Sequence, residues 1–504
     1  MKKNIMLVVL LASSIAISAN KREPVVIKSM PLPALPEFVL STQGADADSY
    51  QAELQKKMNA SKKFNRQIAQ TDTIDEKGFL SESYIQIRNQ FFNIKNPEQL
   101  DAMINQLSQD EYFNKLDRDG QFLALQFTGL KTYKSFFYRA RTYVGKHSAI
   151  RSAFVTSLRM AAVAQQRFSP TPEQKAVFDY FTTPINGMGS DITTDADVEN
   201  FLASEIMPAT NMTYKRLSIL IKKEDKPIHW DNKVYASFAN FSDSADRYAQ
   251  IGLPEQFLLL AGFEQTIAGQ LVSSAYSLTG FSEMINSLTT QFGVDSLNLL
   301  TKVDGISAKK RFDILKRYPN LFSLKAGGAG YTQAAFGFLK ASLQNTKTAW
   351  IYIQNNQSSN SQIAFVINPQ NLMPFSRQIN SGFTNLDSLF SGSELSSAVI
   401  NGEKISINFE KLFTNPPQSM MQFYPTQFNT ENSNLTKTVN GKPTNYRNYL
   451  TDSATGWDYA AFKSYLPKVK AVNSKTADVS KELRIISQIW GANVLGVSLG
   501  ALVF

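Results

Sequence analysis

Not one of the 504 residues is a cysteine, and this narrows how the chain can hold a fold together. Disulfides, thiolate metal sites and cysteine nucleophiles are all excluded. Stability must come from packing alone, and a chain of this length with 43% apolar residues can bury cores for two or three domains. Its 35 Phe and 19 Tyr are too many for a disordered protein, so we expect a globular fold.

The first 19 residues have the composition of an export signal. Lys2 and Lys3 supply positive charge, an apolar run covers 5–17, and Ala16, Ser18 and Ala19 are small enough for a signal peptidase. The apolar run is too short to span a bilayer unaided, so we expect cleavage, with an uncleaved anchor as the alternative. We therefore expect an exported protein of the periplasm or outer envelope, or one secreted into the medium.

Changes in composition divide the chain into five segments. These are a signal peptide (1–19), a Pro-rich tether (20–45), a helical domain (46–325), a mixed strand and loop region (326–470), and a C-terminal helix with an apolar tail (471–504). The fold class that we expect is mainly α: an irregular multi-helix domain followed by a smaller α+β region with β-hairpins. The chain lacks repeated ten-residue alternating segments, so we do not expect a β-barrel.

Apolar residues recur at helical spacing along most of the first 320 positions. The expected helices lie around 97–107, 120–166, 172–182, 195–207, 213–222, 244–250, 254–278, 281–292 and 309–317. Pro97 is a typical first residue of a helix. The glycine-rich segment 326–330 is expected to be a flexible joint after the helical domain.

Strand signals follow this joint. The β-branched and aromatic runs 349–353 and 362–367 predict strands. Asn401-Gly402 and Asn440-Gly441 predict hairpin turns, because Asn-Gly readily adopts the positive φ values of a type I′ turn.

Residues 120–172 contain eight basic residues and no acidic one. The formal net charge of the chain is +10, so this stretch dominates its charge layout. On a helical projection, aromatic residues gather on one side of 131–146 and basic residues on the other. The candidate surface for an anionic partner consists of Lys131, Lys134, Arg139, Arg141 and Lys146. Three interpretations remain open: a membrane interface, a docking surface for an acidic ligand, and a basic face whose carboxylate partners come from other helices.

The last 20 residues, 485–504, carry no charged side chain. Their length as a helix matches a hydrocarbon core, but polar residues among them make the segment only moderately apolar. Membrane or protein contact and docking into the protein core both remain open. The candidate contact residues are Ile489, Trp490, Leu495, Leu499 and Phe504.

Catalytic and metal chemistry have little support in the sequence. The only two histidines, His147 and His229, are 82 positions apart, and we expect no metal and no cofactor. Segment 300–310 resembles a helix-hairpin-helix of DNA-binding proteins, but Ser307 replaces the second hairpin glycine, so we do not expect nucleic acid as a partner.

These observations favour a non-catalytic binding or structural role at the cell envelope. The expected partner is an anionic envelope component or membrane surface, contacted through the basic helix, with a further protein contact through the tail. The alternative is a periplasmic or secreted hydrolase that acts on glycan or wall polymer through carboxylates.

Overall fold

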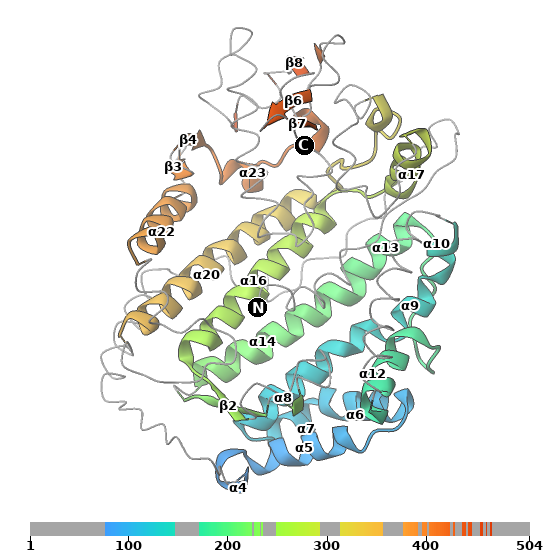
Figure 1. Cartoon of the computed structure of the whole chain (residues 1–504), viewed down its shortest axis with the longest axis vertical. Helices are drawn as coiled ribbons and strands as arrows, with labels where there is room; N and C mark the ends of the chain where they lie inside the picture. Colours follow the sequence, from blue (N-terminus) through green and yellow to red (C-terminus); the bar gives the residue numbers. More distant parts are fainter. Residues whose placement is uncertain are drawn as a thin grey trace.

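The computed structural model describes the chain from residue 76 onward, with gaps. The described residues are 76–146, 171–223, 226–231, 233–234, 248–292, 313–355, 376–391, 396–400, 403–423, 427–428, 436–439, 442–445, 454–456, 460 and 464–465. Helix predominates among them, and their strands form two-stranded antiparallel sheets (Figure 1). The prediction of a mainly α protein with hairpins in its C-terminal part is confirmed. The signal peptide, the tether and the apolar tail lie outside the described residues.

Short helices make up the N-terminal side of the described chain. They are α4 (Glu76–Phe79), α5 (Glu82–Phe92), α6 (Pro97–Ser108), α7 (Asp110–Lys115), α8 (Arg118–Thr128) and α12 (Pro172–Thr182). The Asn96 side chain accepts a hydrogen bond from the backbone N–H of Gln99, and Pro97 follows as the first helical residue, as the sequence predicted. The buried face of α6 consists of Pro97, Leu100, Met103, Ile104 and Leu107.

Three long helices run side by side across the molecule (Figure 1): α14 (Met207–Lys223), α16 (Leu253–Ala275) and α20 (Gly328–Asn355). Gln270 bonds Thr210 and Glu264 bonds Tyr214, so α14 and α16 are antiparallel. Asn345 bonds Glu264, and the rings of Phe257 and Tyr352 stack, so α16 and α20 are antiparallel too. Hydrogen bonds between polar side chains thus fix the register of α14, α16 and α20. Apolar packing holds this layer of three helices together.

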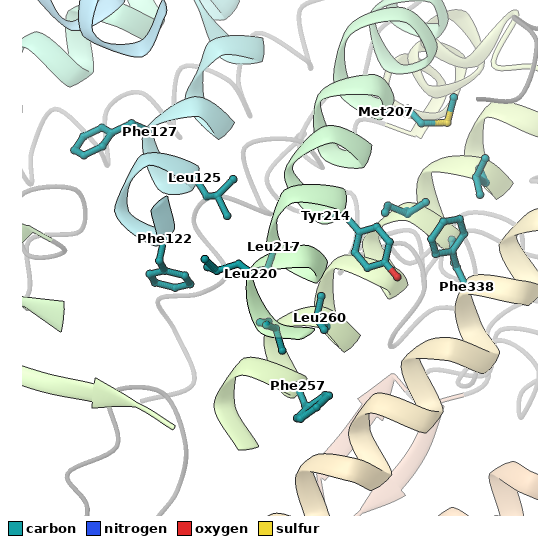
Figure 2. Close-up of a cluster of buried hydrophobic side chains, with 14 of the residues drawn as sticks. Phe122, Leu125, Phe127, Met207, Tyr214, Leu217, Leu220, Phe257, Leu260 and Phe338 are labelled. Atoms are coloured by element: carbon teal, nitrogen blue, oxygen red, sulfur yellow. The ribbon is translucent and has the colours of Figure 1, made fainter. Parts of the chain in front are cut away.

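The main hydrophobic core joins this layer to the N-terminal helices (Figure 2). Leu217 and Leu220 of α14 lie toward Phe122 of α8, while Tyr214 meets Phe338 of α20 edge to face. All five side chains are buried. Burying a large apolar side chain contributes about 1.5–3 kcal/mol, so α14, which packs on both sides, is central to stability.

A second hydrophobic cluster lies at the other end of α14. A short α-helix, α13 (Asp195–Phe201), leads through a π-helical turn, η3 (Leu202–Ile206), directly into α14. The cluster also includes residues of α9 (Phe136–Arg139), α10 (Arg141–Lys146), α17 (Phe281–Phe292) and the segment 313–322. Phe136 stacks on Phe201 at its centre.

Four two-stranded antiparallel sheets complete the described structure. The paired strands are β1 (Ile228–Asp231) with β2 (Tyr248–Ile251), β3 (Ser396–Ile400) with β4 (Glu403–Ile407), β5 (Gln427–Phe428) with β8 (Ala454–Gly456), and β6 (Thr436–Val439) with β7 (Lys442–Asn445). Two of these pairs flank Asn401-Gly402 and Asn440-Gly441, so both predicted hairpins are confirmed. The remaining elements are α22 (Ser376–Phe390), α23 (Lys411–Thr414) and the 3₁₀ turn η7 (Met420–Phe423).

The secondary structure predicted for 349–353, a strand, and for 244–250, a helix, is wrong where the structure describes it. The run 349–353 is not a strand but the last part of α20, where Ala349 and Tyr352 are buried against the core. Tertiary packing outweighs the strand preference of its β-branched and aromatic residues. Segment 248–251 is the strand β2 rather than part of a helix. The predicted strand at 362–367 lies outside the described residues.

The predicted glycine-rich joint is a helix start. Gly327 has φ +81, a left-handed conformation that favours glycine, and α20 begins at the next residue. A Cβ on Gly328 would lie 2.6 Å from the carbonyl oxygen of Ala275. The two glycines therefore let the start of α20 approach the end of α16 closely.

Candidate functional site

The predicted basic helix at 131–146 is interrupted. The chain forms a 3₁₀ turn, η2 (Gly129–Tyr133), then turns and continues as α9 and α10. Ser135 has φ 53, and its N–H donates to the carbonyl of Tyr180 while its Oγ accepts from the N–H of Ile185. The prediction of one continuous helix is wrong, because this buried serine bonds to the end of α12 instead of continuing the helix.

Three of the five predicted surface residues have carboxylate partners from other segments. Lys134 Nζ lies 2.8 Å from Asp101 Oδ2 of α6. The Arg141 guanidinium makes two bonds to Asp191, of 3.0 and 2.9 Å, and lies over the ring of Tyr138. These contacts join the basic stretch to the helices around it.

Arg139 is the most deeply buried of these residues, at 2% exposure. It makes two bonds to Glu205 of η3, of 2.8 and 2.6 Å, and one of 2.7 Å to the carbonyl of Ser190. Its guanidinium also lies 5.0 Å from the ring centroid of Phe201. Such a forked, charge-assisted contact fixes α9 against η3 and is not available to an external partner.

Among the predicted surface residues, Lys131 and Arg141 have exposed side chains. The Lys131 side chain is exposed, and the Arg141 side chain retains 44% exposure beside Asp191. The side chain of Lys146 and the residues Arg151, Arg159 and Arg167 lie outside the described part. So do the candidate tail residues Ile489, Trp490, Leu495, Leu499 and Phe504.

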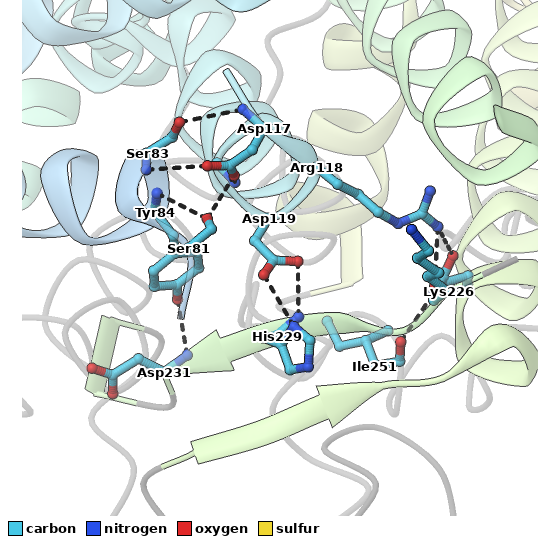
Figure 3. Close-up of polar contacts among 12 residues, drawn as sticks. Ser81, Ser83, Tyr84, Asp117, Arg118, Asp119, Lys226, His229, Asp231 and Ile251 are labelled. Carbon is cyan, nitrogen blue, oxygen red and sulfur yellow. Dashed lines mark hydrogen bonds and ion pairs between the residues drawn. The ribbon is translucent and has the colours of Figure 1, made fainter. Parts of the chain in front are cut away.

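A second charged cluster surrounds the N-terminus of α8 (Figure 3). Asp119 contacts His229 twice: Oδ1 accepts from the backbone N–H at 3.0 Å, and Oδ2 lies 3.1 Å from Nδ1. The ring of Phe79 packs edge-on against the His229 ring, whose side chain is 29% exposed. The sequence could not reveal this pair, because its members are 110 positions apart and the nearer Asp231 is buried against Arg88.

The neighbouring residues of this cluster cap and connect helices. Asp117 accepts bonds from Ser81 Oγ and from the N–H groups of Ser83 and Gly120. Burial alone would raise the pKa of Asp117, but these hydrogen bonds outweigh it and hold the pKa below its ordinary value. Arg118 donates to the carbonyls of Leu220 and Lys226, so the cluster joins α5, α8, α14 and β1.

A third polar cluster lies between the long helices. Glu264 of α16 is 1% exposed and accepts bonds from Tyr214 Oη at 2.8 Å and from Asn345 Nδ2 at 2.9 and 2.8 Å. Burial raises the pKa of Glu264 to about 7, although these bonds and the charge of Lys222 lower it. A carboxyl group that titrates near neutrality is thus enclosed in the main core.

The buried ion pair of Lys325 with Glu199 connects segments next to the second hydrophobic cluster. Lys325 Nζ lies 2.6 Å from Glu199 Oε2, with both side chains at most 5% exposed. Glu199 also accepts from the N–H of Leu278 and from Ser277 Oγ. The pair joins α13 to the end of α16 and the approach to α20.

Among the described residues, no group of three or more His, Asp or Glu side chains is placed to hold a metal ion. Within that same part of the chain, no helix combines the length and apolar character needed to cross a membrane. Comparison with known proteins finds no matching family model, no matching curated protein and no matching solved structure.

Proposed function

We propose that this chain is an exported cell-envelope protein with a non-catalytic binding or structural role, and that its partner is anionic. The observation that carries the proposal is the charge of 120–172, where eight basic residues occur without an acidic one. Carboxylates from elsewhere pair with three of the five basic side chains between 131 and 146. The exposed Lys131 has no ion pair with any described residue, and Arg141 stays partly exposed. Excess positive charge at a surface favours acidic partners.

The contacts of three acidic side chains support the non-catalytic part of the proposal, because each binds a basic residue or histidine inside the protein. Asp119 positions His229, Asp231 pairs with Arg88, and Glu199 pairs with Lys325. Each contact joins segments that are far apart in the sequence, which is the behaviour of groups that fix a fold. The apolar tail at 485–504 remains, in this proposal, a second contact for a membrane or a protein partner.

The test is binding of the purified protein to isolated envelope at a series of salt concentrations. Lys131→Gln with Arg141→Gln removes the two exposed charges among the described residues of this stretch, and we expect release at a lower salt concentration because exposed charge contacts are screened. The matched control is Lys115→Gln with Lys340→Gln, which also removes two exposed positive charges, from α7 and α20; the Lys115 side chain is 71% exposed in a helical ion pair with Glu111. Equal release profiles for all three proteins would contradict a contact through this surface.

The alternative is a hydrolase of glycan or wall polymer that acts through carboxylates, in which Asp119 would hold His229 as a general base. A histidine held by a carboxylate through Nδ1 can act as a general base through its other nitrogen. The alternative predicts that purified protein releases reducing ends from wall polymer. It also predicts that His229→Gln abolishes the release while the melting temperature stays unchanged. No release by the wild-type protein would leave the binding role as the better account.

A further inference from the structure

The outer face of α14 carries an unusual pair of side chains. Met212 and Ile219 are 51% and 58% exposed, and they are the large hydrophobic residues that stand out as exposed in the described part of the chain. They are seven positions apart, which is about two helical turns, so they lie on one side of the helix. Tyr214, Leu217 and Leu220 occupy its opposite side, in the core.

Positive charge accompanies these two residues. The exposed lysines Lys215 and Lys222 share their side of the helix, at helical spacings of three and four. From Met207 to Lys223 the helix has four basic residues and no acidic one. One of the four, Arg216, is paired with Asp110 and packed over Phe113, while the side chains of Lys215 and Lys222 are exposed. Unlike 131–146, this is an uninterrupted helix of 17 residues.

We propose that this face of α14, formed by Met212, Lys215, Ile219 and Lys222, docks on a membrane surface of anionic phospholipid. The inference rests on the proposed function for the envelope location and goes beyond it, because it assigns lipid contact to a second surface, on α14 and not on 131–146. Lysine ammonium groups attract lipid phosphates, while methionine and isoleucine side chains at the same level enter the boundary between headgroups and acyl chains. The charge complementarity selects lipid of negative charge, and the small apolar area predicts reversible binding.

The experiment is flotation of the full mature chain with vesicles of phosphatidylcholine containing 30% phosphatidylglycerol, compared with vesicles of phosphatidylcholine alone. We expect binding to the anionic vesicles only. Lys215→Gln with Lys222→Gln should weaken it by about 20-fold, since each lysine near an anionic surface contributes about fivefold. Met212→Ser with Ile219→Ser should weaken it by at least tenfold, whereas Met212→Leu with Ile219→Leu should preserve it, because leucine keeps the apolar surface.

Control variants separate the possible failures. Lys115→Gln with Lys340→Gln removes the same charge from exposed positions on α7 and α20, and melting temperatures show whether each variant is folded. Vesicle binding that persists at full strength in the α14 variants would overturn the inference. Absence of vesicle binding, with envelope retention that salt still reverses, would overturn it too but leave the anionic-partner proposal standing with a non-lipid partner. Loss of both vesicle binding and envelope retention would contradict both proposals.

Discussion

At the scale of single residues, buried polar groups form the specific contacts between segments of this cysteine-free chain. Arg139 with Glu205, Arg88 with Asp231, and Lys325 with Glu199 each join elements that the sequence separates widely. A buried ion pair adds little net stability when both partners are present, but removal of one partner leaves an uncompensated charge. Substitutions at these residues should therefore be far more severe than at surface pairs.

Arg139→Met should destabilise the protein by about 3 kcal/mol, because Glu205 and the Ser190 carbonyl both lose a charged donor. Lys115→Met removes one partner of an exposed pair with Glu111 and should change the free energy of unfolding by less than about 0.5 kcal/mol. Urea unfolding of both variants measures the difference. Similar values for the two would show that Arg139 is not a structural residue.

Glu264 makes stability depend on pH. Because its folded pKa of about 7 lies above the ordinary value of 4.5, its contribution is fully present below pH 4.5 and is lost as the pH rises through 7. The ionised carboxylate should therefore cost about 3 kcal/mol at pH 8. Glu264→Gln, which cannot ionise, should stabilise the protein by up to that amount at pH 8 and have little effect at pH 4.5.

The control for this variant is Glu111→Gln, since the Glu111 side chain is 84% exposed. Its unfolding free energy should follow the wild-type pH profile. If Glu264→Gln followed that profile as well, the carboxyl group would not be titrating within the fold.

At the scale of elements, local signals in the sequence identified structure where the backbone itself imposes it. Asn401-Gly402 and Asn440-Gly441 lie between paired strands, and Pro97 begins a helix. Signals that rest on side-chain preference failed where packing decided otherwise, as in 349–353, which ends α20. The break at Ser135 depends on bonds to residues 45 and 50 positions away, so no local pattern could predict it.

The candidate binding surfaces could be predicted from the sequence only in part. The basic residues between 131 and 146 were found from charge alone, but their partners Asp101, Asp191 and Glu205 come from distant segments. The exposed stripe of α14 requires knowledge of which side of that helix is buried. Its seven-residue spacing of Met212 and Ile219 looks the same in sequence as a pair of core residues.

Glycine positions test the backbone geometry of the elements. Gly280 has φ +89, and an added Cβ would lie 2.9 Å from Tyr318 Cδ1, so Gly280→Ala should destabilise by about 1–3 kcal/mol. Gly262 lies inside α16 with no atom within 4 Å of an added Cβ, so Gly262→Ala should stabilise by about 0.5–1 kcal/mol. Thermal unfolding should shift in opposite directions, and equal shifts would contradict the φ value at Gly280.

At the scale of the whole molecule, packed helices carry a positive surface without disulfide support. The long layer of α14, α16 and α20 connects the N-terminal helices to the hairpin-containing region (Figure 1). Buried charges such as Arg88 with Asp231 and Lys325 with Glu199 pair with one another, while Lys131, Lys215 and Lys222 are exposed. Ion pairs inside the protein together with exposed lysines suit a protein that binds the envelope. The proposed anionic partner and the proposed lipid contact of α14 both depend on these exposed lysines.

Fractionation of cells that express the full chain tests the central claim most directly. The envelope fraction is washed with high salt and then with detergent, and the protein is followed in each supernatant. The account predicts export, retention by the envelope and release by salt, because screening weakens exposed charge contacts. Protein found free in the periplasm, or retained in the cytoplasm, would contradict it, and release by detergent alone would assign the attachment to apolar contacts instead of charge.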